Sequence, residues 1–134
     1  MLSPAVDNLN TINEFFDYFI DDYIINVIVD CTNKRLVSDQ KPVTGVEIRG
    51  FIGLLLFLGV TKKHDIEISE VYKVGSVHYS DWATVCMSRE RFYLIASIIT
   101  FDDTQTRNVR YQSNPKLHKI IEVFERLNMN FQAG

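Results

Sequence analysis

Two pairs of adjacent acidic residues, Asp21-Asp22 and Asp102-Asp103, are the first candidates for chemistry in this sequence. Paired carboxylates can hold the two metal ions that promote phosphoryl transfer. Asp21-Asp22 lies within a helical pattern, where neighbouring side chains point about 100° apart and cannot converge on one metal. We therefore expect it to lie on a solvated helix face. Asp102-Asp103 follows a predicted helix, and we expect it to have a structural or loop-capping role.

Other residue types that often form catalytic or metal sites are scattered along the chain. The histidines and cysteines are His64, His78, His118, Cys31 and Cys86. They show neither His-x-x-x-His nor Cys-x-x-Cys spacing, which argues against a zinc site. No glycine-rich phosphate loop precedes a helix, and no arrangement of Ser, His and Asp fits a nucleophile motif. We predict no catalytic site, metal, cofactor or small-molecule substrate, and two free, buried thiols in a reducing compartment.

Helical periodicity describes the elements that would position these residues. The first helix is predicted from Thr11, where a capping box can start it, to about residue 33, and a polar loop ending at Pro42 follows. The second helix has the strongest start signal, because Thr44 can cap it while Glu47 stands three residues later. Nearly every side chain from there to Val60 is apolar, so we expect this helix to be buried on most sides.

Two further long helices are predicted in the C-terminal half. One begins with Ser88 as its cap and buries Phe92, and the other begins at Asn114-Pro115. The connections are expected to be a short helix over 69–74, an irregular segment over 75–85 and a polar loop over 102–113. No convincing alternating strand is present. The predicted fold class is therefore all-α: an irregular helical bundle of about four long helices with a short extra helix and polar loops.

Glycines interrupt the apolar second helix. Gly50 and Gly53 lie three residues apart, and each costs up to about 1 kcal/mol in a helix interior relative to alanine. Either the helix merely tolerates them or another helix approaches closely at this point, and both explanations remain open. Gly59 is expected at the end of the helix.

Length and composition fit one folded domain. The 134 residues are 46% hydrophobic and 12% aromatic, which is enough for a packed core. We expect an N-terminal tail over 1–10 and one helical domain over 11–134. No signal peptide is recognisable, and the apolar run over 51–60 is too short to cross a bilayer. An intracellular protein without a membrane partner is therefore expected.

Charge is unevenly distributed along the chain. The total is −3, but residues 1–33 carry −6, residues 34–64 carry +4, residues 65–103 carry −4 and residues 104–134 carry +3. A self-sufficient DNA-binding domain usually has a clear basic surplus, because phosphate contacts dominate its affinity. This chain has two local basic zones instead.

Several short motifs occur in a fixed order along the chain. They are Cys31-Thr32-Asn33, residues 42–48, residues 53–60, residues 87–92 and residues 98–103. Together they resemble the N-terminal part of piggyBac-type transposases and of the host proteins derived from them. The resemblance runs from about Phe15 to the C-terminus. Residues 88–92 are the best match, in which Arg91 and Phe92 correspond to the family's Arg-Phe pair.

The resemblance implies a mainly helical dimerisation and DNA-binding module. In that family the catalytic carboxylates lie farther along, in an RNase H-like domain absent from this chain, so the chain is not expected to be an enzyme by itself. The implied partners are DNA at transposon ends or derived sites, the chain itself, or a full-length transposase. The implied location is the nucleus. The residues expected to be structural parts of the motifs are Thr44, Glu47, Ser88, Arg91 and Phe92.

Four basic residues are the candidates for DNA contact: Lys62 and Lys63 at the end of the second helix, and Arg107 and Arg110 in the polar loop. Ordinary structural roles also remain open, since cations stabilise helix C-termini. Three functions follow: a non-catalytic transposase module in DNA binding or assembly, a helical protein-interaction domain without a nucleic-acid role, or a remnant without stable function. The negative net charge favours the second.

Overall fold

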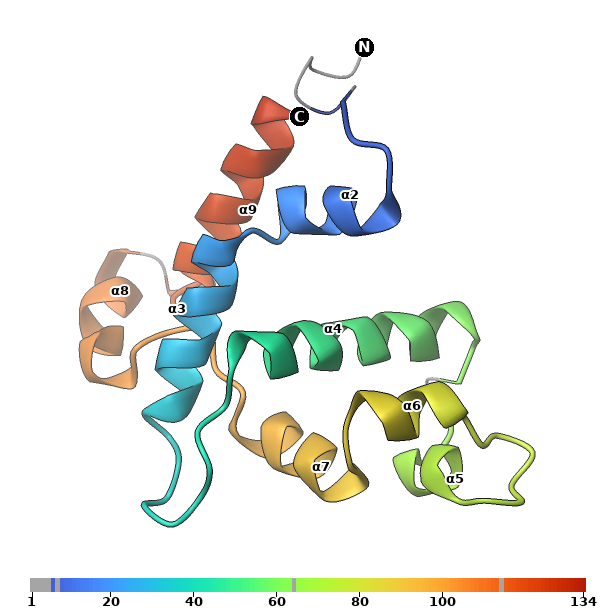
Figure 1. Cartoon of the computed structure of the whole chain (residues 1–134). Helices are drawn as coiled ribbons and strands as arrows, with labels where there is room; N and C mark the ends of the chain where they lie inside the picture. The colour runs from blue at the N-terminus through green and yellow to red at the C-terminus, as the bar shows by residue number, and fades with distance from the viewer. Residues whose placement is uncertain (1–5, 7, 64, 114) are drawn as a thin grey trace. The chain divides into compact units, whose positions relative to one another are not determined.

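The computed structural model describes residues 6, 8–63, 65–113 and 115–134 (Figure 1). Within these residues the secondary structure is helical and contains no strand, which confirms the predicted all-α fold class. The chain divides into two compact units. Unit 1 combines Met1–Leu36 with Thr100–Gly134, and unit 2 is the intervening segment Val37–Ile99.

Unit 1 is built on the packing of two N-terminal helices against the C-terminal helix. Its helices include α2 (Ile12–Phe19), α3 (Asp22–Asn33), the 3-10 helix η1 (Thr104–Thr106), α8 (Arg107–Ser113) and α9 (Ile121–Ala133). Phe19 of α2 stacks on Phe131 of α9, with ring centroids 4.6 Å apart, while α3 buries Ile24 and Ile28. These apolar side chains join helices that are distant in sequence into one core.

The predicted first helix is two helices, so this part of the prediction is wrong. α2 ends at Phe19, and Asp21 is the N-cap of α3, where its side chain accepts a hydrogen bond from the Ile24 N–H group. Aspartate stabilises a helix start better than a helix interior. The same carboxylate accepts a hydrogen bond from Arg126 Nε at 2.8 Å. Asp21 therefore does not lie on a solvated helix face, although Asp22 is exposed.

The prediction of a polar loop over 102–113 is also wrong, because this region contains η1 and α8. The last long helix begins at Ile121 rather than at Asn114-Pro115, and Asn114 lies outside the described residues. Turns occupy residues 115–120, where His118 Nδ1 lies 2.8 Å from the Pro115 carbonyl oxygen. This side-chain contact with the backbone satisfies a carbonyl group that a longer helix would have used.

Unit 2 has its core between its longest helix and three shorter ones. Its helices in the described residues are α4 (Gly45–Val60), α5 (Ile68–Tyr72), α6 (Asp81–Cys86) and α7 (Arg89–Ile98). α5 agrees with the predicted short helix, whereas α6 lies in the segment predicted to be irregular. The Phe51 ring of α4 packs against the Phe92 ring of α7, with centroids 5.1 Å apart. Ile48, Leu54 and Ile95 are fully buried around this contact.

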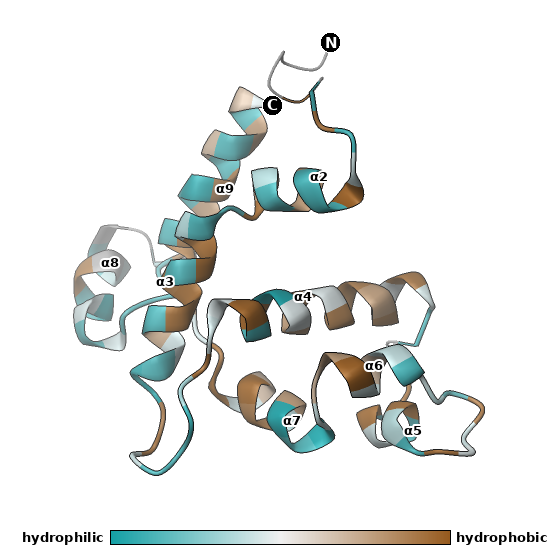
Figure 2. Ribbon diagram, in the orientation of Figure 1, coloured by the Kyte–Doolittle hydropathy of each residue, from teal (hydrophilic) through white to brown (hydrophobic). Residues whose placement is uncertain are grey.

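α4 is less buried than its apolar composition predicts. Leu55, Leu56 and Val60 are 47%, 55% and 82% exposed, so the expectation of burial on most sides is wrong. Figure 2 shows apolar or intermediate colouring along most of α4. Length and composition still separate it from a membrane helix. Among the described residues, no helix has the length and hydropathy needed to cross a bilayer.

The glycines of α4 mark a close approach by α6. A Cβ atom on Gly50 would lie 3.1 Å from Cys86 Sγ, and one on Gly53 would lie 3.8 Å from a ring atom of Trp82. The Cys86 thiol donates to the Gly50 carbonyl at 3.5 Å. Close packing, rather than mere tolerance, therefore explains Gly50. Gly59 is the second-last residue of α4, as predicted for a glycine near the helix end.

Candidate nucleic-acid interface

Lys62 and Lys63 terminate α4. The Lys63 N–H group donates to the Leu58 carbonyl at 2.8 Å and the Lys62 N–H group to the Gly59 carbonyl at 3.2 Å, which are the two hydrogen bonds of a Schellman motif. Lys62 occupies the left-handed position with φ of 57°, where glycine is usual. Lys63 Nζ donates to the His78 carbonyl at 3.1 Å. Lys62, by contrast, is exposed and presents its charge to solvent.

Arg107 is bound to an acidic residue of its own unit. Its Nε and Nη2 atoms donate to the two carboxylate oxygens of Asp102 at 2.8 and 2.9 Å. These hydrogen bonds raise the pKa of Arg107. A guanidinium group engaged in this fork has fewer donors left for a phosphate group. Arg110 lies on α8, but its side chain is outside the described part of the structure.

Asp102-Asp103 anchors the segment that follows unit 2, in agreement with the predicted structural and capping role. Asp102 is only 3% exposed, and Asp103 caps η1 while it accepts a hydrogen bond from Lys34 Nζ at 2.7 Å. Beside them, the buried Thr32 hydroxyl accepts from the Thr100 N–H group at 3.2 Å. These bonds tie the chain back to α3 as it re-enters unit 1.

Arg91 and Glu47 connect α7 to α4. Arg91 Nε and Nη2 donate to the two oxygens of Glu47 at 2.8 and 3.0 Å. Other guanidinium N–H groups donate to the carbonyls of Lys41 and Pro42, each at 3.0 Å. Glu47 also accepts from the Thr44 N–H group at 3.0 Å and so completes the predicted capping box. The hydrogen bonds from Arg91 outweigh desolvation and lower the pKa of Glu47.

Ser88 and Phe92 complete this joint between the two helices. The Ser88 hydroxyl accepts from the Arg91 N–H group at 3.2 Å and caps α7, as predicted. Phe92 is 4% exposed and packs on the ring of Phe51. Half-buried Glu47 and Arg91 and buried Phe92 therefore hold α4 and α7 together, while Thr44 and Ser88 cap these helices at the surface.

The two cysteines are free thiols, Cys31 buried and Cys86 half-buried. Burial raises the pKa of both thiols and keeps them protonated at neutral pH. Among the described residues, no group of three or more His, Cys, Asp or Glu side chains is placed to hold a metal ion.

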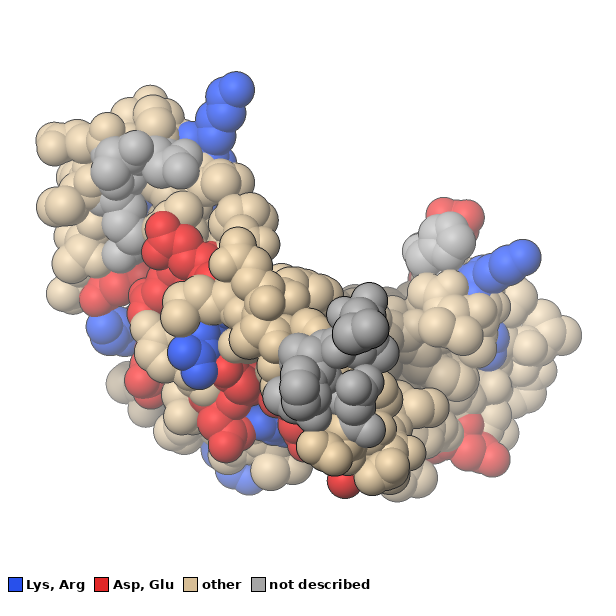
Figure 3. All heavy atoms as spheres, turned by 90° about the horizontal axis from the view of Figure 1, so that it is seen from above, with Lys and Arg blue, Asp and Glu red and all other residues tan. Residues whose placement is uncertain are grey.

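Neither unit has a basic surplus. Unit 2 contains seven basic and seven acidic residues, and unit 1 contains seven basic and ten acidic residues. On the face shown in Figure 3, Lys and Arg side chains alternate with Asp and Glu and form no continuous basic patch among the residues described. The stretch without acidic residues that contains the most Lys and Arg is residues 107–119, with four. We call this stretch the basic segment.

A ring contact organises the basic segment. The Tyr111 ring of α8 meets the His118 ring edge-on, with centroids 5.1 Å apart. This contact holds α8 beside the turn that carries Lys116 and Lys119, both of which are exposed. Lys116 and Lys119 thus present their positive charge from a turn that contacts α8.

A comparison with known proteins identifies the family. A protein-family model described as Transposase IS4 matches residues 12–133, which is nearly the whole chain. The chain belongs to this transposase family. The match extends across both units, from the start of α2 to the end of α9. No curated protein and no solved structure matches the chain.

The basic residues of this transposase-family chain are distributed over both units. Lys62 and Lys63 lie in unit 2, whereas Arg107 and Arg110 lie in unit 1. Sequence reasoning missed Lys116 and Lys119 as candidates. The signal that identifies them is the lack of any acidic residue over 107–119. A count of charges over the larger range 104–134 also includes acidic residues and does not reveal this signal.

Proposed function

We propose that this chain is a non-catalytic module of a piggyBac-type transposase that binds DNA and assembles with a transposase. The motif residues support the relation to piggyBac-type proteins. Arg91 and Phe92, which match the Arg-Phe pair of that group, form the joint between α4 and α7 together with Glu47 and Phe51. Three of the ordered motifs, residues 42–48, 53–60 and 87–92, thus lie in unit 2.

The observation that carries DNA binding is the basic segment. Lys116 and Lys119 are exposed, and Tyr111 beside them is 53% exposed. Exposed lysines displace the counterions of nucleic-acid phosphates, and this release supplies most of the affinity of non-specific binding. An exposed aromatic ring adds a surface on which a base can stack. Arg107 already donates two hydrogen bonds to Asp102. Lys116 and Lys119, rather than Arg107, are therefore the main proposed contacts.

The use of the acidic pairs supports a module without catalysis of its own. Asp21 caps α3 and bonds to Arg126, Asp102 bonds to Arg107, and Asp103 caps η1 and bonds to Lys34. A carboxylate held by arginine or by backbone N–H groups has fewer oxygen lone pairs available for a metal ion. These carboxylates therefore have structural roles as helix caps and ion-pair partners.

DNA binding is tested with a labelled duplex across a salt series, with light scattering on the same samples for mass. We expect weak binding that weakens as salt rises. The double variant Lys116→Gln/Lys119→Gln should reduce the slope of log K against log salt by about 2, because each lost phosphate contact removes about 1. Salt-insensitive binding, or no binding by a folded sample, would contradict the proposal.

Lys62 offers a charge-removing variant that does not threaten the fold. Glycine suits the left-handed backbone of this position, so Lys62→Gly should leave stability unchanged or raise it by up to about 1 kcal/mol. If Lys62 contacts DNA, the variant lowers the salt slope by about 1. Lys41→Gln is the matched control, since it removes one exposed charge that is not among the proposed DNA contacts. If both variants lower the salt slope equally, Lys62 affects binding only through the net charge of the chain and does not contact DNA.

A protein-interaction domain is the second candidate function. The balanced charge of unit 2 and the exposed apolar side chains of α4 favour it, since such patches mark protein contacts. A partner retained at high salt by the intact chain, together with no duplex binding, would favour this function over DNA binding. A sample without cooperative thermal unfolding would instead indicate a remnant without a stable fold.

A further inference from the structure

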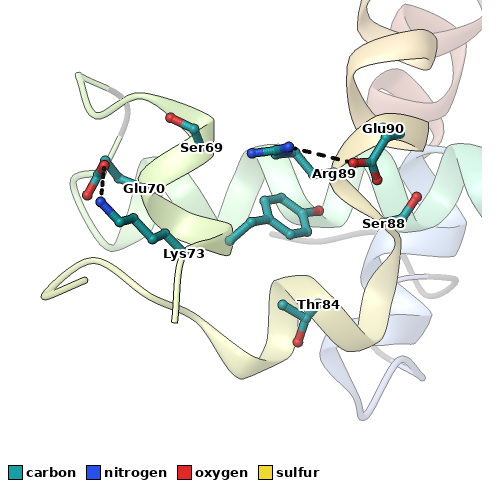
Figure 4. Close-up of a pocket in the computed structure, with 8 residues that line it drawn as sticks. Ser69, Glu70, Lys73, Thr84, Ser88, Arg89 and Glu90 are labelled. Atoms are coloured by element: carbon teal, nitrogen blue, oxygen red, sulfur yellow. Dashed lines mark ion pairs between the residues drawn. The ribbon is translucent and has the colours of Figure 1, made fainter. Parts of the chain in front are cut away.

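Unit 2 contains a pocket of about 620 Å³ that none of the functions above uses. Figure 4 shows its walls: Ser69, Glu70 and Lys73 come from α5 and its C-terminal end, Thr84 from α6, and Ser88, Arg89 and Glu90 from the start of α7. Tyr72 also lines the pocket. The side chains therefore converge from three helices of one compact unit.

The Tyr72 hydroxyl lacks a hydrogen-bond partner. Less than 1 Å² of this oxygen atom is exposed. Among the buried side-chain oxygen and nitrogen atoms of the described residues, it is the one without a hydrogen-bond partner. Burial, with smaller contributions from the neighbouring Cys86 and Glu90, raises the pKa of Tyr72 to about 12. The hydroxyl thus keeps its proton at neutral pH and lies within electrostatic reach of the first turn of α7. An unpaired buried hydroxyl costs stability, so its position calls for an explanation.

The α7 side of the pocket is rich in hydrogen-bond donors. Arg89 and Glu90 are separated by 3.7 Å at their closest charged atoms, and their side chains are 49% and 78% exposed. Such an exposed pair is weak and easily exchanged. Ser88, Arg89 and Glu90 at the N-terminal end of α7 line this side, and the positive end of a helix favours an anion. The Tyr72 hydroxyl and the Arg89 guanidinium group are thus two donors that line one pocket.

We propose that this pocket binds a carboxylate group of a polypeptide partner, which accepts hydrogen bonds from the Tyr72 hydroxyl and the Arg89 guanidinium group. The incoming carboxylate takes the place of Glu90 beside Arg89, and movement of these two exposed side chains opens access to the hydroxyl. The site requires no nucleic acid and is independent of the DNA-binding proposal.

The charge of the pocket favours a single carboxylate over a nucleic-acid backbone. Lys73 and Arg89 are matched by Glu70 and Glu90, so the rim has no basic surplus for a row of phosphates. Lys73 lies 3.9 Å from Glu70 on the opposite wall, where that pair is satisfied within α5 and its end. One negative group can therefore enter at Arg89, whereas a second would meet Glu70.

The test uses the full chain and a fluorescent peptide of alternating Gly and Glu residues, followed by anisotropy. A Gly and Gln peptide of equal length is the neutral control. We expect saturable binding of the acidic peptide alone. Tyr72→Phe and Arg89→Gln should each weaken it about tenfold or more, because hydrogen bonds to charged groups are the strong ones. Glu90→Gln should tighten it by up to about fivefold, since it removes the competing carboxylate.

Tyr93→Phe is the matched control for Tyr72→Phe, because Tyr93 is a 47% exposed tyrosine on α7 outside the pocket. It should bind the acidic peptide as the unmodified chain does. Thermal unfolding supplies a second measurement: Tyr72→Phe should melt at a higher temperature than the unmodified chain, since it removes the unpaired hydroxyl. Circular dichroism establishes that each variant is folded.

Three results would overturn the proposal. One is equal binding, or no binding, of the acidic and neutral peptides by a folded chain. Another is undiminished peptide binding by Tyr72→Phe. The third is displacement of the peptide by inorganic phosphate as effectively as by acetate, which would assign the site to phosphate groups. Duplex titration of the same samples separates these results from a failure of DNA binding.

Discussion

At the scale of single residues, Glu47 has two structural roles, one in a helix cap and one in an ion pair. Its carboxylate accepts from the Thr44 N–H group at the start of α4 and from the Arg91 guanidinium group of α7. The sequence predicts the first role, since Thr44 and Glu47 have capping-box spacing. The second depends on a contact across 44 positions, and residue spacing carries no information about it.

Loss of Arg91 is expected to destabilise unit 2 strongly. Arg91→Ala leaves the half-buried Glu47 without its cation and two backbone carbonyls without donors, which should cost about 2–4 kcal/mol. Thr44→Ala, which removes one cap and keeps the ion pair, should cost about 1 kcal/mol. Urea unfolding of the two variants measures the difference. Equal losses would show that the ion pair contributes nothing beyond the cap.

Acid is expected to weaken the same contact. Arg91 lowers the pKa of Glu47 below its ordinary value of 4.5, so the folded state favours the charged carboxylate. The resulting stabilisation is fully present above pH 4.5 and is lost as the pH falls through the lower folded-state value. Melting temperatures from pH 6 to pH 3 should therefore show unmodified chain and Glu47→Gln converging in acid. A constant difference across this range would contradict the assignment.

At the scale of elements, helix starts with a strong capping residue could be predicted from the sequence. A break between two helices could not be predicted where the apolar periodicity continues across it. Ser88 begins α7 as the sequence indicates, because a serine before an amphipathic stripe has one clear role. The break before α3 was not predictable from the stripe, since apolar residues continue at helical spacing through Ile20. In the structure, Asp21 is a cap because its side chain accepts from the Ile24 N–H group, and Arg126, from a helix distant in sequence, binds the same carboxylate.

Two glycines of α4 are expected to respond oppositely to alanine. At Gly59 nothing lies within 4 Å of an added Cβ atom, so Gly59→Ala should stabilise by about 0.5–1 kcal/mol through helix propensity. At Gly50 the added atom would lie 3.1 Å from Cys86 Sγ, so the same change should gain nothing or destabilise. Thermal unfolding of the pair measures the contrast. A larger gain at Gly50 would mean that α6 does not pack there.

At the scale of the whole molecule, one unit is inserted into the other along the sequence. Unit 2 is continuous, whereas unit 1 is assembled from residues on both sides of it. Neither composition nor charge predicts this division, because the apolar periodicity of the helices does not state which helices pair. For the same reason the sequence identified basic residues but not their partners, and Arg107 proved to be held by Asp102.

The continuous unit is expected to fold by itself. Residues 37–99 contain the α4–α7 core with its ion pair and buried aromatic rings, so the excised segment should be helical and should unfold cooperatively. Circular dichroism during heating measures this. The Arg91→Ala form of the segment is the control and should melt earlier. An unstructured segment of unaltered sequence would show that unit 2 depends on unit 1.

The divided construction of unit 1 has a consequence for protein synthesis. α2 and α3 emerge from the ribosome roughly a hundred residues before α9, which at 5–20 residues per second is roughly 5–20 s. During that interval Phe19 lacks the ring of Phe131, and a neighbouring nascent chain can supply its own α9 instead. We therefore predict domain-swapped dimers when the chain refolds at high concentration, and none when folded monomer is concentrated. Gel filtration of both samples distinguishes this route from association through surfaces of the finished fold.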